Sequence, residues 1–290
     1  MLPFRIIDHE KGRLLVLQQK WDDAFVDVIQ QEKIQAICLD HTRKWRHEGD
    51  LSFLAKLQGI IIHHLILKDA TLANLEGIYH LSSLRSLFLG TQCSSVLDIS
   101  RLPVLEELTI WLGKARATSF AGHPHLRSLE LLSHEGKDIS DLSELPNLQQ
   151  LQISNSPLDS LDGLRGLKSL QNLELSHLTK LKSLDSVDHL SNLESFELRV
   201  CKKVRSIEPL SRLPNLRTIL LEDCGEIESV RPILGLKRLE RMSIVGTTSI
   251  VDGDLRSLES IPTLKFLGFT NKRHYNIKNK DISPNHRISV

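Results

Sequence analysis

The chain has 290 residues, of which 40% are hydrophobic, 25% charged and only 4% aromatic, a composition that fits one or two globular domains with an aliphatic core. Its 37 Lys and Arg residues nearly balance its 36 Asp and Glu residues. The net charge of +1 excludes a strongly basic protein that would be attracted as a whole to nucleic acid or to an anionic membrane.

Apolar stretches are short throughout the chain. The longest, such as residues 14–17, extend over about four residues, whereas a membrane-spanning helix needs roughly 20. Charged residues between positions 5 and 13 interrupt the region where the apolar core of a secretory signal would lie. The four cysteines, Cys38, Cys93, Cys201 and Cys224, include no CxxC pair, so we expect buried, reduced thiols in a cytoplasmic protein.

Residues 1–33 precede the first repeat and predict an N-terminal cap. Residues 4–8 (FRIID) and 13–17 (RLLVL) predict a pair of strands joined by a turn. A short helix follows, with Asp22 or Asp23 as its N-terminal capping residue. We expect these elements to cover the first unit of a repeat array.

Residues 34–270 contain one pattern eleven times, apolar-x-x-apolar-x-apolar, at intervals of 21 to 28 residues. The clearest copies read LRSLFL (84–89), LRSLEL (126–131) and LQNLEL (170–175). Each copy predicts a short strand, and the repetition predicts that neighbouring units bury each other's apolar side chains. The first residues of the copies are Ile34, Ile62, Leu84, Leu105, Leu126, Leu148, Leu170, Leu193, Leu216, Leu239 and Leu264.

Between the strands the apolar spacing becomes three residues, as in Cys201, Val204 and Ile207. This spacing fits 3₁₀ turns better than an α-helix of period 3.6. In five units a proline lies two residues before the first apolar position, where its missing amide and its effect on the preceding residue end the turn. These prolines are Pro103, Pro124, Pro146, Pro214 and Pro262.

The phased copies resemble the leucine-rich-repeat superfamily, and their lengths are nearest to its short, internalin-like subclass. The resemblance implies an α/β fold, a horseshoe-shaped solenoid with a parallel concave sheet of about eleven strands and a convex side of mostly 3₁₀ or irregular segments. It also implies a protein that binds other proteins without catalysis. Related repeats often place asparagine or cysteine after the strand to hydrogen-bond the turn. Asparagine is largely absent there, and Cys201 and Cys224 are expected to take this structural role.

Side chains that point away from the core are candidates for binding. If the apolar positions of each copy face inward, the alternating positions face outward from the concave sheet. There an apolar diagonal of four residues lies beside acidic residues, so we expect apolar anchors for a partner protein and carboxylates that select a basic patch on it. The diagonal comprises Ile66, Phe88, Trp111 and Leu132. The other predicted partner-binding residues are Glu107, Glu130, Gln152, Glu174, Glu197, Arg199 and Glu222.

The alternative interpretation is that this face is only solvated, with Arg199 and Arg241 neutralising the carboxylates and the N-terminal cap covering the aromatic residues. Two further segments are candidates for binding. They are the loop HTRKWRH (41–47) and the basic C-terminal tail 271–290, with five Lys and Arg residues against Asp281 alone. The polarity of the tail predicts a solvated, partly disordered terminus, and an arm for nucleic acid or an acidic partner is the alternative.

Motifs for catalysis are absent from the sequence. It has no GxxxxGK[ST], GxGxxG, GxSxG or HExxH motif, and its histidines form no complete metal-ligand set. We therefore expect no enzymatic activity, cofactor or metal, and predict an adaptor or a bacterial immunity protein that blocks a basic toxin. The alternatives are a regulatory subunit of an enzyme such as a phosphatase, and a surface adhesion protein, which the missing secretory signal disfavours.

Overall fold

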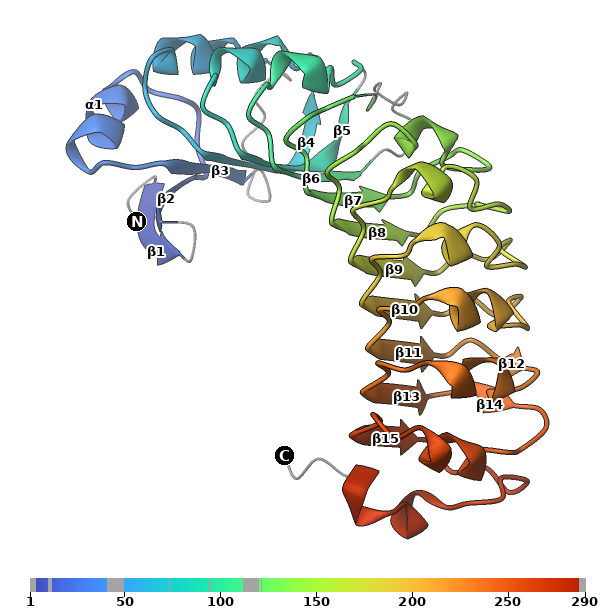
Figure 1. The fold of residues 1–290 in the computed structure, drawn as a ribbon. Coiled ribbons are helices and arrows are strands. Elements are labelled where there is room, and N and C mark those ends of the chain that lie inside the picture. The colour runs from blue at the N-terminus through green and yellow to red at the C-terminus, as the bar shows by residue number, and fades with distance from the viewer. Residues whose placement is uncertain are drawn as a thin grey trace. The chain divides into compact units, whose positions relative to one another are not determined.

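The computed structural model describes residues 4–9, 12–40, 50–72, 74–93, 95–111, 120 and 122–286, without the side chains of 69–71 and 91–93. The predicted binding loop 41–47 lies outside the described residues. The chain forms two compact units, Met1–Leu132 (unit 1) and Ser133–Val290 (unit 2). In both units, short strands alternate with turns (Figure 1).

Unit 1 is built on strands and a short α-helix. Its elements are β1 (Phe4–His9), β2 (Gly12–Leu17), α1 (Ala24–Gln31), β3 (Ala36–Asp40), β4 (His64–Leu72), β5 (Ser86–Cys93), β6 (Glu107–Trp111) and β7 (Ser128–Leu132). β1 and β2 form an antiparallel hairpin, and from β2 to β7 each strand pairs in parallel with the next. Phe25 and Ile29 of α1 are buried, which docks the helix on the core.

Unit 2 continues the same pattern. Its main strands are β8 (Gln150–Ser154), β9 (Asn172–Ser176), β10 (Ser195–Arg199), β11 (Thr218–Glu222), β13 (Arg241–Val245) and β15 (Phe266–Phe269), paired in parallel in this order. β12 (Glu226–Ile227) and β14 (Ser249–Ile250) form a small parallel sheet of their own. The predicted repeat strands are confirmed, because β3 to β11, β13 and β15 each start two residues after the first residue of a copy.

Short 3₁₀ segments form the side of each repeat opposite the strands (Figure 1). They confirm the 3₁₀ turns that the apolar spacing of three predicts. Asp98 caps η3 by accepting a hydrogen bond from the amide of Ser100 (3.1 Å), and Asp138, which precedes the N-cap residue of η4, accepts one from the amide of Ser140 (3.0 Å). No helix in the described part of the chain is long and apolar enough to span a bilayer. The segments are η1 (Ser52–Leu57), η2 (Glu76–His80), η3 (Ile99–Arg101), η4 (Ser140–Leu142), η5 (Leu164–Gly166), η6 (Val187–His189), η7 (Glu208–Arg212), η8 (Arg231–Gly235), η9 (Arg256–Ser260), η10 (Asn279–Asp281) and η11 (Pro284–His286).

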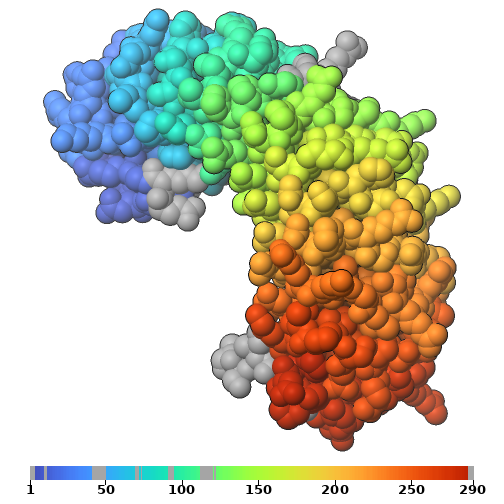
Figure 2. Space-filling view, viewed as in Figure 1, coloured from blue at the N-terminus to red at the C-terminus, as the bar shows by residue number. Residues whose placement is uncertain are grey.

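The core of each unit is a stack of aliphatic side chains from the apolar positions of the pattern. Leu170, Leu173 and Leu175 of one repeat are at most 1% exposed. Leu173 is the register partner of Phe196, and Phe196 is that of Ile219, so equivalent residues lie on one another. In Figure 2 the repeats of unit 2 accordingly follow one another as bands of colour. Each buried side chain contributes roughly 1.5–3 kcal/mol, and the burial depends on the neighbouring repeats.

A column of residues with left-handed backbone follows the strands of unit 2. Asn155, Val200 and Asp223 have φ angles between 53° and 55°. The amide of Asn155 donates to the carbonyl of Ser176 (3.0 Å), and the amide of Val200 donates to that of Glu222 (2.8 Å). These bonds join one repeat to the next beyond the end of its strand. The left-handed column comprises Ser133, Asn155, His177, Val200 and Asp223.

The C-terminal segment 271–286 is packed, which corrects the expectation of a solvated, partly disordered tail. Tyr275, Ile277 and Ile282 are 2–5% exposed. The Tyr275 hydroxyl accepts a hydrogen bond from the Ile250 amide (2.9 Å), and its ring meets Phe269 edge-on. The segment therefore covers apolar surface of the last repeat, as a solenoid end requires.

We predict that Val200→Asn stabilises the protein. A β-branched residue at positive φ is strained by about 1–2 kcal/mol, whereas asparagine tolerates this conformation. Thermal unfolding should show a Tm higher by about 2–4 °C. The control is Val245→Asn, in ordinary strand backbone of β13, which should not raise the Tm. Equal Tm changes in the two variants would show that Val200 carries no strain.

Candidate protein-binding face

The face of the sheet that points away from the 3₁₀ segments carries the outward positions of each strand, and we call it the open face. In β10, Ser195, Glu197 and Arg199 are half-buried there, whereas Phe196 and Leu198 are fully buried in the core. This alternation follows from the pleat of a strand. The outward side chains on the open face therefore take no part in packing the core.

In unit 1 the open face carries an apolar row. The strand register places Cys38 of β3 beside Ile66 of β4, and Ile66 beside Phe88 of β5. Ile66 and Phe88 are half-buried. Ile66 packs against a buried open-face cluster of Leu14, Val16, Ala36 and Cys38. The hairpin strand β2, which supplies Leu14 and Val16, therefore shields Ile66. The alternative interpretation expected the N-terminal cap to cover the aromatic residues, but Trp111 is 42% exposed.

The ring of Phe88 lies along its own strand over Gly90. A Cβ atom at position 90 would come within 2.3 Å of Cε1 of Phe88, so glycine is required for this ring position. A hollow of about 340 Å³ opens beside the ring on the open face of unit 1. Ile66 and Phe88 supply its apolar wall, and polar groups of His9, His64, Lys68, Ser86, Glu107, Thr109 and Ser128 line the rest.

Trp111 lies at the end of β6 and is 42% exposed. Its register partner Leu132, on β7, is half-buried. On the same strand Glu107 is exposed, while Glu130 of β7 is half-buried and accepts a hydrogen bond from the Thr109 hydroxyl (3.1 Å). The four residues of the predicted apolar diagonal thus differ in exposure, with Trp111 the most accessible.

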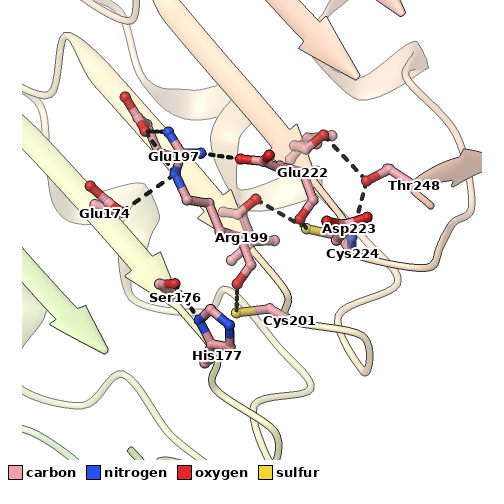
Figure 3. Close-up of polar contacts among 12 residues, drawn as sticks. Glu174, Ser176, His177, Glu197, Arg199, Cys201, Glu222, Asp223, Cys224 and Thr248 are labelled. Atoms are coloured by element: carbon pink, nitrogen blue, oxygen red, sulfur yellow. Dashed lines mark hydrogen bonds and ion pairs between the residues drawn. The ribbon is translucent and has the colours of Figure 1, made fainter. Parts of the chain in front are cut away.

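In unit 2 the open face carries an acidic patch, which comprises Glu174, Glu197, Glu222 and Arg199. Glu174 and Glu197 are direct register partners, and Arg199 is the partner of Glu222. The guanidinium lies between the three carboxylates (Figure 3), 2.7 Å from Glu197 and 3.4 Å from Glu174, with Glu222 as its third partner. These four side chains are 30–35% exposed. Burial lowers the pKa of Arg199, but the three carboxylates outweigh burial and raise it.

Arg199 therefore neutralises part of the negative charge of the acidic patch, as the alternative interpretation of this face expected. Three carboxylates against one guanidinium still leave an excess of two negative charges. Arg241 behaves differently, because its guanidinium lies 4.7 Å from the centre of the Phe266 ring. Gln152 on β8 is half-buried beside Glu174, its register partner.

Several residues that line the hollow are not among the predicted partner-binding residues, and the titratable ones are His9, His64 and Lys68. Lys68 and His64 occupy outward positions of β4, so the strand periodicity could have identified them. His9 comes from β1, which lies outside the repeat pattern. Its position at the hollow depends on the hairpin register, which no periodicity encodes.

A column of small polar side chains follows the strands, and these side chains donate hydrogen bonds to backbone carbonyls. We call it the turn column. The Cys224 thiol donates to the carbonyl of Leu198 (3.1 Å), and the Thr248 hydroxyl donates to that of Leu221 (3.2 Å). The Cys201 thiol donates to the carbonyl of Arg199 (3.3 Å). The predicted structural role of these cysteines agrees with this geometry (Figure 3). The turn column comprises Ser156, Cys201, Cys224 and Thr248.

Burial also suppresses the reactivity of these thiols. It raises the pKa of Cys201 to about 12 and the pKa of Cys224 to about 11. Burial raises the pKa of Cys38, in the open-face cluster, to about 11 as well. Among the described residues, no group of three or more His, Cys, Asp or Glu side chains is placed to hold a metal ion.

No protein-family model and no curated protein matches the chain. Solved structures do match it. The internalin InlF of Listeria monocytogenes aligns at a TM-score of 0.65 and 20% identity, over 92% of this chain and 75% of that one. The TLR13–ssRNA13 complex aligns at a TM-score of 0.53 and 17% identity, over 90% of this chain and 50% of that one. The chain therefore has the leucine-rich-repeat fold, and the expected resemblance is confirmed at the level of the fold.

Arg199→Met should destabilise the protein by about 1–2 kcal/mol, because it removes the cation that separates three carboxylates. The loss should shrink in 1 M salt, where the Debye length falls to about 3 Å. Chemical denaturation at low and high salt measures both effects. The control is Arg205→Met, which breaks an exposed ion pair with Glu226. A loss equal to that of the control, or independent of salt, would contradict the central role of Arg199.

Native Cys38, Cys201 and Cys224 should resist alkylation at pH 8. Their pKa values of about 11 to 12 keep them protonated, and a protonated thiol is a poor nucleophile. Peptide mapping after brief treatment with iodoacetamide measures this, and the same treatment in denaturant should label all three residues. Rapid labelling of the native protein would show that the repeats open locally.

Proposed function

We propose that the chain is a non-catalytic module that binds a partner protein through its open face. The observation that carries this proposal is Trp111, which is 42% exposed on a regular strand. Tryptophan is among the residues most enriched in binding hot spots, because its large flat surface gains most from removal of water. The half-buried Leu132 beside it extends the apolar contact surface.

The acidic patch of unit 2 supports a partner with a basic patch. Its two excess negative charges lie on side chains that are about one-third exposed, where they attract cations and still form ion pairs. Arg199 holds the carboxylates in fixed positions, so a partner does not have to order them on binding. An adaptor and an immunity protein that blocks a basic toxin are the two roles that we propose.

The charge of the chain also supports a protein over a nucleic acid as partner. The net charge of +1 and the acidic patch give no field that attracts phosphates. TLR13, which has the same fold, was solved with ssRNA13, but its likeness to this chain extends to the fold alone. The free, buried thiols of Cys38, Cys201 and Cys224 support a reducing compartment, and we propose the cytoplasm.

The test is affinity capture from the native host with quantitative mass spectrometry. Trp111→Ala should reduce the captured partner by at least about tenfold, because loss of a hot-spot residue costs 2 kcal/mol or more. The double variant Glu174→Gln, Glu197→Gln should also weaken capture, and the loss should be larger at low salt than at high salt. Val251→Ala is the matched control, since Val251 is 50% exposed but lies after β14, off the open face.

Retention of the partner by both open-face variants would overturn the proposal. Loss of the partner from Val251→Ala alone would instead place the contact on the side of the turns. Circular dichroism of each variant confirms that the fold is intact, because all four substituted side chains lie outside the core.

A further inference from the structure

The hollow in unit 1 lies on a diagonal of three chemically different side chains. Lys68 is on β4, Phe88 on β5 and Glu107 on β6, and all three line the hollow. The register pairs Lys68 with Gly90, two residues after Phe88, and it pairs Ser86 with Glu107, two residues before Phe88. From Lys68 to Phe88 and from Phe88 to Glu107, the diagonal therefore moves to the next strand and, at the same time, two residues toward the N-terminal end of that strand.

The two ends of this diagonal carry opposite charges. The Lys68 side chain is exposed and has no ion pair with the described residues. Its register partner Gly90 has no side chain, and the Phe88 ring lies over Gly90 on the neighbouring strand. Glu107, at the other end of the diagonal, is also exposed. Ile66 and Phe88 supply the apolar surface between them.

The dimensions of the diagonal match an extended peptide. Two strand spacings of about 4.8 Å and four residues of about 3.3 Å separate the Lys68 and Glu107 backbones by about 16 Å. In an extended peptide, side chains on one face recur about every 6.6 Å, so residues i and i+4 are about 13 Å apart. Flexible Lys and Glu side chains bridge the difference. The volume of the hollow, about 340 Å³, is at the lower end of the range of volumes found for ligand pockets. We therefore expect it to take one apolar side chain.

We infer that this hollow binds an extended segment of the partner protein with the pattern acidic-x-apolar-x-basic. The apolar side chain enters between Ile66 and Phe88, the acidic residue pairs with Lys68, and the basic residue pairs with Glu107. This inference rests on the proposed function and names the chemistry of the segment that the open face of unit 1 selects.

The test is selection of displayed seven-residue peptides against the full-length protein and two charge variants. The wild type should enrich acidic-x-apolar-x-basic segments in either chain direction, because reversal of the peptide exchanges its ends. Lys68→Glu should change the preference to two basic residues around the apolar one, and Glu107→Lys should change it to two acidic residues. Anisotropy measurements with selected peptides should show a change of about two- to fivefold in Kd for each reversed charge.

Lys180→Glu is the control, because Lys180 is exposed in unit 2 and its substitution makes the same change in net charge as Lys68→Glu. It should keep the wild-type preference. The inference is overturned if the wild type enriches no charged pattern, or if the preference of the two hollow variants equals that of the control. The proposed function is still supported after such a result if Trp111→Ala no longer captures the partner that the wild type captures. Retention of that partner overturns the proposed function independently of the peptides.

Discussion

The whole structure depends on the fact that one repeat cannot bury its own leucines. Leu173 is removed from water because Phe196 of the next repeat lies on it, and Phe196 is buried in turn by Ile219. The parallel register, the tight 3₁₀ turns and the left-handed column all serve to bring equivalent residues of successive repeats together. The same constraint explains the ends, where Tyr275 and its neighbours replace a missing repeat.

Because the core uses only the inward positions, the open face is free to differ from one unit to the other. Unit 1 presents Trp111 and a hollow beside Phe88, whereas unit 2 presents carboxylates around Arg199. Gly90 leaves room for the Phe88 ring in unit 1, and Arg199 bridges the three carboxylates in unit 2.

Most of the fold followed from periodicity, because the apolar positions that define each copy are the positions that pack. The start of every repeat strand from β3 to β15, the 3₁₀ turns and the role of Cys201 and Cys224 were accessible in this way. The candidate site was less predictable. The strand offsets identify Arg199 and Glu174 as outward-facing, but only the side-chain rotamers show that they form an ion pair. The packing of the C-terminal segment 271–286 was missed because its apolar residues, Tyr275, Ile277 and Ile282, do not continue the pattern.

The turn column leaves the residue type at its position open. Its task is to supply one hydrogen-bond donor to a carbonyl, and serine, cysteine and threonine all do this in the same chain. The requirement at this position is thus a small, buried donor, and three residue types meet it while the strands before it stay in register.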